Sequence, residues 1–328
     1  MNKKLILVML TICTAFGLTA FPTIGKAGST EQTVLVTTFP IYQIVRNVTE
    51  GRDGVLLDLM LPSQLGCPHD YALTPRDMQK LAKADILVVN GLGLEEFLGA
   101  PVRKANPKIT VIDSSIGIEE TLEYSEDHNH GHDNSKAEHH HHGKERHYHG
   151  HDHHHAGINP HLFASPRMTA RLAMNVAAEL SKADPKGAAI YLRNAQAYAG
   201  SMNRLADEMS ALGKRLKNNR IVQPHGIFDY LARDIGLTIV AVMQAHGQEP
   251  SASEMMQLVK TIRKKQAGAI FTEPQYPEKV GKSLSKETGI PVAMLDPVAT
   301  GPENAPLTYY ETIMRQNMKT LESTLGVK

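Results

Sequence analysis

One long helical pattern in the middle of the chain limits how it can fold. From Pro185 to residue 217 no further proline occurs, and apolar residues recur every three or four positions, at Tyr191, Ala195, Tyr198, Met202, Leu205, Met209, Leu212 and Leu216. This spacing is typical of one continuous amphipathic helix, whose rise per residue makes it about 48 Å long. A small lobe is narrower than this. The pattern therefore favours a rigid helix that joins two lobes over half of a coiled coil or an ordinary core helix.

Short strand patterns alternate with helix starts on both sides of this helix. Strands are predicted at 33–38, 55–60, 86–90 and 109–112 before it, and at 221–223, 237–242, 269–272 and 292–295 after it. Thr74-Pro75 and Ser165-Pro166 pair a capping residue with proline at a helix start, and Ser251 with Glu254 forms a capping box. The sequence thus predicts an α/β fold of two doubly wound parallel-sheet lobes joined by the long helix.

The predicted organisation has four parts: a signal peptide at 1–27, an N-terminal α/β lobe at 33–184, the connecting helix at 185–217 and a C-terminal α/β lobe at 218–328. Two lysines precede an apolar run at 5–18, and small residues follow near position 27, as in a secretory signal. The run is short for a membrane-spanning helix. We therefore expect an exported, periplasmic protein. A lipid anchor at Cys13 is the alternative, although the bulky Ile12 suits that signal poorly.

Histidine is concentrated in one segment of the N-terminal lobe. Thirteen of the seventeen histidines lie there: His128, His130, His132, His139, His140, His141, His142, His147, His149, His151, His153, His154 and His155. Such a polar segment cannot bury a core, so 125–156 is predicted to be a disordered loop. Imidazole is a common ligand for zinc and related metals. The loop is therefore interpreted as an auxiliary metal-binding segment rather than an expression tag.

Four metal-capable residues lie in loops where a principal site would form. His69, His225 and Asp296 follow predicted strands, and His161 directly precedes a helix. Ligands of open α/β sheets bind beyond the carboxyl ends of the strands. Three imidazoles and one carboxylate make a four-coordinate set suited to zinc, with two ligands from each lobe. Water in place of Asp296 stays open, and Glu273 is either an outer hydrogen-bond acceptor or a rival carboxylate ligand.

Charge, motif content and cysteine count limit the classes of partner and of chemistry that the sequence supports. The net charge is +1, from 35 basic and 34 acidic residues, which gives no support for nucleic acid or an anionic membrane as partner. No HExxH motif or nucleophile elbow occurs, so we do not expect an enzyme. Once a signal is removed, Cys67 is the only cysteine, which rules out an intramolecular disulfide. Cys67 is either a thiolate ligand beside His69 or, as we favour, a buried thiol.

Six segments carry a resemblance to a known family: 37–48, 68–91, 159–169, 224–237, 271–280 and 295–302. In this order they resemble the periplasmic solute-binding proteins of bacterial zinc and manganese ABC importers, specifically the zinc type with a His-rich loop. The resemblance covers essentially the whole chain after the signal. Two departures are Cys67 beside the first ligand histidine and the lack of a cysteine pair in the second lobe.

The resemblance implies two α/β lobes on one long helix and a metal site of His69, His161, His225 and Asp296. Manganese-type relatives typically have glutamate at the third position, so His225 favours Zn²⁺ as the transported ligand. The implied partner is an ABC membrane permease, with a periplasmic zinc chaperone as a further candidate and a monomeric state expected. Three other functions stay open: a zinc hydrolase using Glu273, an adhesin or zinc-buffering surface protein, and a manganese or iron importer component.

Overall fold

The computed structural model describes residues 31–66, 68, 71–124, 157–244 and 249–328. The predictions for the signal peptide with Cys13, for the His-rich loop and for Cys67 and His69 fall outside these residues. Glu31–Lys328 forms one compact unit. Within the described part of the chain, every helix is too short or too polar to cross a bilayer.

The first sheet is parallel and has the strand order β2-β1-β3-β4. Its strands are β1 (Gln32–Val36), β2 (Val55–Leu59), β3 (Ile86–Val89) and β4 (Thr110–Asp113). Val34 and Val36 of β1 pack in one core with α1 (Phe39–Thr49) and α4 (Pro166–Ala183). Leu35, which points to the opposite face, packs with α2 (Pro75–Lys83) and α3 (Gly99–Ala105). Helices therefore cover both faces, as predicted.

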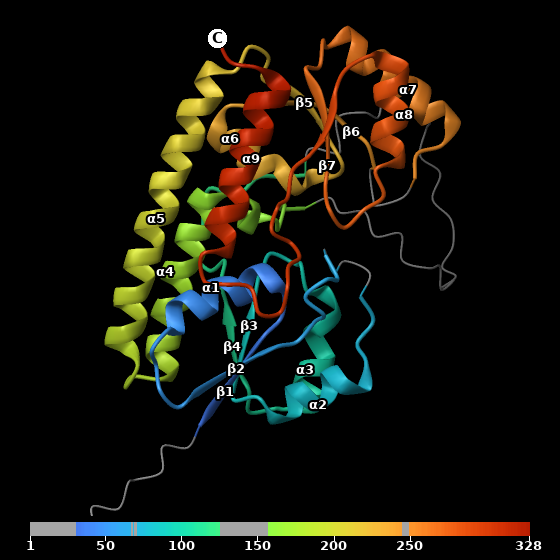
Figure 1. Ribbon diagram of the computed structural model, residues 1–328. Coiled ribbons are helices and arrows are strands. Elements are labelled where there is room, and N and C mark those ends of the chain that lie inside the picture. The colour runs from blue at the N-terminus through green and yellow to red at the C-terminus, as the bar shows by residue number, and fades with distance from the viewer. Residues whose placement is uncertain (1–30, 67, 69–70, 125–156, 245–248) are drawn as a thin grey trace, which may run out of the picture. The chain divides into compact units, whose positions relative to one another are not determined.

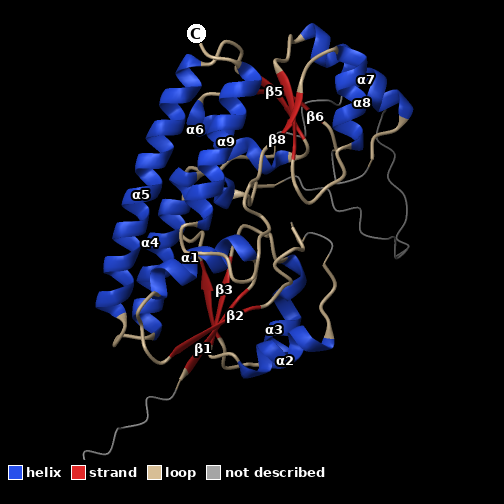
Figure 2. Ribbon diagram, in the orientation of Figure 1, coloured by secondary structure: helices blue, strands red, loops and turns tan. Residues whose placement is uncertain are grey.

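The second sheet repeats the same parallel order, as β6-β5-β7-β8. Its strands are β5 (Arg220–Gln223), β6 (Thr238–Val242), β7 (Ala269–Thr272) and β8 (Val292–Met294). Val222 and Ile270 pack with α7 (Ala252–Lys264) and α8 (Lys279–Thr288), whereas Ile221 and Phe271 join the core of α6 (Asp229–Ile235) and α9 (Tyr309–Leu325). The two sheets and their helices are seen in Figures 1 and 2. The sequence shows no recognisable internal repeat that would have predicted this repeated strand order.

Local sequence signals place several helix ends correctly. Thr74 and Ser251 each form a capping box, with Asp77 and Glu254 respectively. Ser165 accepts a hydrogen bond from the Met168 backbone at the start of α4. Each cap satisfies backbone N–H groups that the first helical turn leaves unpaired. Each cap therefore fixes the residue at which its helix begins and the position of the loop that leads into it.

The long helix is α5 (Ala188–Arg215), slightly shorter than the predicted 185–217. Every residue of its predicted apolar face is buried. Helix α4 packs beside it, and α1, α6 and α9 also contact it (Figure 1). One continuous apolar core therefore includes residues of both sheets and α5. The helix connects the two lobes, as predicted, and it is also a core helix. The sequence pattern presented these two roles as alternatives, but α5 has both.

Gly213 marks the closest approach between α5 and α6. A Cβ atom there would lie 1.7 Å from the carbonyl oxygen of Ile235, the last residue of α6. Backbone cannot give way as a flexible side chain can, so only glycine fits. Gly200, on the same helix, has only the end of the Arg204 side chain nearby, at 3.6 Å.

These two glycines should respond to alanine in opposite directions. Gly213→Ala should lower the free energy of unfolding by about 2 kcal/mol or more, because α5 and α6 must separate. Gly200→Ala should raise it by about 0.5–1 kcal/mol through helix propensity. Urea denaturation followed by circular dichroism measures both. Equal effects of the two substitutions would show that the α5–α6 approach is looser than described.

Candidate metal centre

His161 is fully buried in the short loop between the Asn159-Pro160 dipeptide and α4. Its Nδ1 lies 2.8 Å from Asn159 Oδ1, and its backbone N–H donates to the same oxygen at 2.9 Å. The rings of Tyr124 and Phe163 pack edge-on against the imidazole, with centroids 6.0 and 5.9 Å away. The ring is therefore held from several sides in a setting that excludes most water.

The Asn159 loop is tied to the carboxyl ends of the first sheet. Asn90, which directly follows β3, donates through Nδ2 to the Pro160 carbonyl at 3.0 Å. Its backbone N–H donates to Glu95 at 2.7 Å, and Thr37 after β1 donates to the same carboxylate at 2.6 Å. Burial raises the pKa of Glu95 to about 7, against the lowering effect of these donors. His161 is thereby positioned by the ends of β1 and β3.

His225 comes from the second sheet, two residues after β5 ends at Gln223. Its side chain is 14% exposed. Its ring centroid lies 5.2 Å from that of His161, with an interplanar angle of 77°. The Tyr276 ring packs edge-on against it, with centroids 5.9 Å apart. The structure thus brings two sequence-predicted imidazoles from different lobes into contact.

Glu273 follows β7 directly and its side chain is fully buried. Its Oε1 lies 2.9 Å from His225 Nδ1. Within the described residues, Oε1 accepts no hydrogen bond of good geometry. Glu273 Oε2 accepts a hydrogen bond from Gln275. The short contact with Nδ1 favours Glu273 as the outer partner of His225 over an independent ligand.

Asp296 follows β8 after one intervening residue, and its backbone is held by α9. Asn317 accepts a hydrogen bond from Asp296 N–H at 3.0 Å and donates to its carbonyl at 2.7 Å. The Asp296 side chain accepts from Val298 N–H at 2.7 Å. Burial raises the pKa of Asp296 to about 6; the Val298 hydrogen bond opposes this and the negative charge of Glu273 adds to it. The two carboxylates therefore lie close enough to repel each other.

The loop that leads toward position 69 is fixed to the second lobe at two points. Gly301 N–H donates to the Ser63 carbonyl at 3.1 Å, and Gln64 donates to the Gly301 carbonyl at 2.6 Å. Gly66 packs so closely against Gln275 that a Cβ atom there would lie 3.1 Å from its side chain. Its positive φ of 80° also favours glycine. These contacts join the first lobe to the loops that carry Glu273 and Asp296.

The described residues make an incomplete metal site. No three histidine, cysteine, aspartate or glutamate side chains among them are arranged to hold an ion together. His161, His225, Glu273 and Asp296 nevertheless come from loops at the carboxyl ends of both sheets. They supply two imidazoles and two carboxylates, which are ligand types suited to zinc. A divalent cation would also offset the repulsion between the two carboxylates. The residue types therefore fit zinc, and His69 lies outside the described residues.

Sequence reasoning gave no role to two asparagines of this site. Asn159 lies in the Asn-Pro-His segment, and its proximity to His161 was the available signal. Asn317 lies in the middle of α9, where nothing in the local pattern points to Asp296. Both act through hydrogen bonds to residues that the fold brings close.

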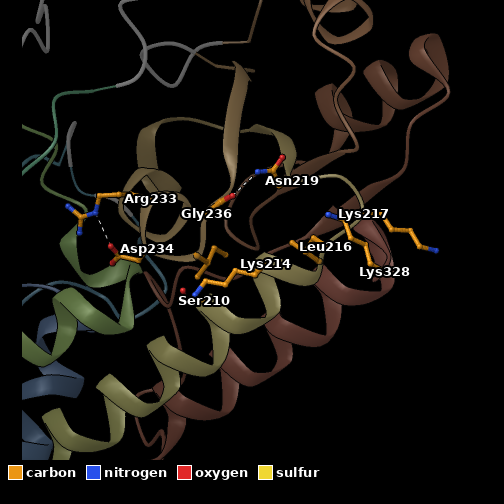
Figure 3. Close-up of a pocket in the computed structure, with 11 residues that line it drawn as sticks. Ser210, Lys214, Leu216, Lys217, Asn219, Arg233, Asp234, Gly236 and Lys328 are labelled. Atoms are coloured by element: carbon orange, nitrogen blue, oxygen red, sulfur yellow. Dashed lines mark hydrogen bonds and ion pairs between the residues drawn. The ribbon is translucent and has the colours of Figure 1, made fainter.

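A separate cavity of about 410 Å³ lies where α5 and α6 end (Figure 3). Four cationic side chains line it, Lys214, Lys217, Arg233 and Lys328. Arg233 pairs with Asp234 at 2.8 Å, and Asn219 donates to the Gly236 carbonyl at 2.8 Å. None of the candidate metal ligands lines this cavity. Its positive charge does not suit a metal cation, so we do not assign the metal to it.

Two parallel-sheet lobes that bring imidazoles and carboxylates together from their strand ends define a solute-binding protein of the metal-binding type. Residues 34–324 match the family described as the periplasmic component A of the zinc-uptake complex. The chain belongs to this family.

Named relatives are consistent with this family. The chain is 29% identical over 335 residues to the zinc-binding protein AdcA of Streptococcus pyogenes serotype M3, of which it spans only 62%. It is 27% identical over 300 residues to the high-affinity zinc uptake system protein ZnuA of Bacillus subtilis, covering 90% of this chain and 88% of that one.

Solved structures share the fold. The solute-binding protein FpvC of Pseudomonas aeruginosa, in complex with Ni²⁺, has a TM-score of 0.72 and 25% identity, over 90% of this chain and 97% of that one. A Zn(II)-bound mutant variant of AdcAII from Streptococcus pneumoniae has a TM-score of 0.72 and 24% identity, over 90% and 99% of the two chains. At this identity the latter bears on the fold alone.

The raised pKa of Asp296 predicts how the metal-free protein responds to pH. Because the folded-state pKa is about 6 and the ordinary value is 3.8, the folded state binds the proton more tightly. The ionised group therefore destabilises the fold above pH 6, by up to about 2–3 kcal/mol, and this cost disappears as the pH falls toward 4. Asp296→Asn should stabilise the metal-free chain at pH 7.5 and have little effect at pH 4.

Urea denaturation of wild type and Asp296→Asn at the two pH values measures this difference. Asn can still accept the Val298 hydrogen bond, so the comparison isolates the charge. Asp53→Asn, which changes an exposed carboxylate in the turn between α1 and β2, controls for general charge effects. The same stability difference at both pH values would contradict the prediction.

Proposed function

We propose that this chain is the extracytoplasmic solute-binding component of a zinc importer, which captures Zn²⁺ and delivers it to an ABC permease. The observation that carries the proposal is the His161–His225 pair, with centroids 5.2 Å apart and the buried Glu273 carboxylate beside it. Zinc favours imidazole, whereas manganese favours oxygen ligands. Family membership and the zinc-binding names of the two relatives described above support the same metal.

The proposed ligands are His69, His161, His225 and Asp296, with Glu273 acting through His225. A carboxylate beside the distal nitrogen of a ligand histidine fixes the ring and increases its basicity. Cargo must be released again, and protonation is one route, since zinc binds neutral imidazole and ionised carboxylate. We therefore propose a binding site and not a catalytic one. Affinity should fall as the pH drops through the imidazole range and toward the Asp296 pKa of about 6.

The family and the names of two relatives support an extracytoplasmic location. These relatives are the metal ABC transporter substrate-binding lipoprotein SloC of Streptococcus mutans and the zinc-binding lipoprotein AdcA of Streptococcus pneumoniae serotype 4. Two alternatives are compatible with this location. Either a signal peptide that ends near residue 27 is cleaved, or the protein is anchored by a lipid at Cys13. The mass of the mature protein separates the two, since only the second retains residues 13–27 and carries acyl chains. We further propose that the His-rich segment 128–155 binds additional zinc more weakly.

Metal identity and stoichiometry test the proposal directly. The full chain and a variant lacking 128–155 are equilibrated with equal Zn²⁺ and Mn²⁺, desalted and measured by plasma mass spectrometry. We expect one tightly held zinc in the deletion variant and more than one in the full chain. His161→Ala and His225→Ala should each lose the tight zinc. The control is His246→Ala, which changes a histidine that belongs neither to the predicted ligands nor to the His-rich segment, and it should keep the zinc. Retained manganese, or no metal in the deletion variant, would contradict a zinc site between the lobes.

The continuous core around α5 predicts a small change in lobe orientation on zinc binding. Residues of both sheets share one buried apolar core with this helix, so a wide rotation of the lobes would expose apolar surface. Spin labels at Lys104→Cys on α3 and Lys286→Cys on α8, in a Cys67→Ser background, report the distance between lobes. We expect the same distance distribution with and without zinc. A change of many ångströms in the distance between the labels would contradict this prediction and would indicate that zinc is loaded by hinge closure of the lobes.

A further inference from the structure

Asn159 lies between the His161 imidazole and the turn that follows His225. It is fully buried and uses every polar atom of its side chain. Oδ1 faces Nδ1 and the backbone N–H of His161, at 2.8 and 2.9 Å. Nδ2 donates to the Gly226 carbonyl at 2.6 Å and to Asp229 Oδ2 at 2.9 Å. One side of the amide therefore meets the His161 loop, and the other meets the turn that follows His225.

The orientation of this amide follows from its partners. Nδ2 faces a carbonyl and a carboxylate, which only accept hydrogen bonds, and Oδ1 faces a backbone N–H, which only donates. A flipped amide would place oxygen against two acceptors and nitrogen against a donor. The contact at His161 Nδ1 is consequently N–H to oxygen, which gives the ring the tautomer protonated at Nδ1 and leaves the lone pair on Nε2.

Asp229 and Gln223 extend the connection into the second lobe. Asp229 begins α6, and its Oδ1 accepts a hydrogen bond from Gln223 Nε2 at 2.7 Å. Gln223 is the last residue of β5, and its Oε1 accepts from Phe228 N–H at 3.1 Å. In this series Gln223 Nε2 and Asn159 Nδ2 donate to the Asp229 carboxylate, and Asn159 Oδ1 faces His161 Nδ1. A carboxylate at its centre polarises the amide and so strengthens its acceptance of the imidazole proton.

The backbone on both sides of Asn159 is held as well. Its carbonyl accepts a hydrogen bond from Tyr230 of α6 at 2.7 Å, and the Tyr230 hydroxyl accepts from Leu122 N–H at 3.0 Å. Asn159 N–H donates to the Leu122 carbonyl at 2.7 Å. A Cβ atom on Gly226 would lie 3.1 Å from Asn159 Nδ2, so the two loops are in close packing. The amide is thus rigidly placed between the lobes.

We propose that Asn159 is a positioning residue of the zinc site. It selects the His161 tautomer that presents Nε2 to the metal and fixes the His225–Gly226 turn relative to His161. The proposal rests on the zinc-binding function proposed above. Loss of an outer hydrogen-bond partner of a ligand histidine typically weakens metal affinity by about 10–100-fold, and this is the effect expected for Asn159→Ala.

Two variants separate the two roles of the amide. Asn159→Ala removes both the acceptor for His161 and the donor for Gly226. Asn159→Asp keeps an acceptor beside His161 Nδ1 but loses the donor and places a second carboxylate against Asp229. Asn194→Ala is the matched control, because Asn194 also bridges two carbonyls, those of Val48 and Glu50, at 3.1 and 2.8 Å, but belongs to α5 away from the site.

The first readout is the tautomer, measured in the metal-free full chain. Long-range ¹H–¹⁵N spectra distinguish a ring protonated at Nδ1 from one protonated at Nε2, and comparison with His161→Gln assigns the resonances. Wild type, Asn159→Asp and Asn194→Ala should show His161 protonated at Nδ1. Asn159→Ala should show a mixture of both tautomers. A residue that only supports the fold would leave this signature unchanged.

The second readout is zinc affinity, from competition with a chelator at one equivalent of Zn²⁺ per chain. Affinity should fall about 10–100-fold in Asn159→Ala, by less in Asn159→Asp, and not in Asn194→Ala. Unchanged tautomer and affinity in Asn159→Ala would overturn the proposal, and so would an affinity loss without a change of tautomer. If His161→Gln bound zinc as tightly as wild type, the proposed zinc site itself would fail, whatever the tautomer spectra showed.

Discussion

Burial of the apolar face of α5 is the interaction on which the rest of the molecule depends. Residues from Tyr191 to Leu212 lie in a core that also contains residues of both sheets. The antiparallel neighbour α4 starts beside the second half of α5, where Arg167 pairs with Asp207 at 2.8 Å. His161 lies five residues before α4 begins at Pro166, and His225 follows α5 after one short strand. The helix pair therefore brings two distant chain segments to the same end of the core, where their imidazoles meet.

Charge at this end of the core is arranged for a cation rather than for internal pairing. Glu273 is buried, and one of its oxygens accepts no directed hydrogen bond from the described residues. Burial raises the pKa of Asp296 to about 6, and the negative charge of Glu273 adds to this shift. Such a pair costs stability in the metal-free protein. Anionic groups placed this way raise the binding free energy available to a divalent ion, because the ion removes a repulsion as well as forming bonds.

Periodicity and position predicted most of the fold and part of the site. The apolar face of α5 was predictable because apolar residues recur every three or four positions, and so was the position of His225, Glu273 and Asp296 after strands. That these residues bind a metal stays a proposal. The pairing of α5 with α4 was not predictable, because nothing in the sequence of α4 indicates which helix it packs against. Nor were Asn159 and Asn317, because hydrogen bonds between residues far apart in the chain leave no local pattern. His69 stays a prediction, outside the described residues.

A continuous core between two lobes also constrains how cargo can leave. Opening the lobes widely would separate apolar surfaces that α5 holds in one cluster, at a cost that grows with the area exposed. Hydrogen-bonded loops cost far less to rearrange, about 1 kcal/mol for each exchanged bond when water replaces the partner. The loops that carry His161 and His225 come from different lobes and are joined by the hydrogen bonds of Asn159. If the chain transports zinc as proposed, release would proceed through changes in these loops, where a few hydrogen bonds fix the position of both imidazoles.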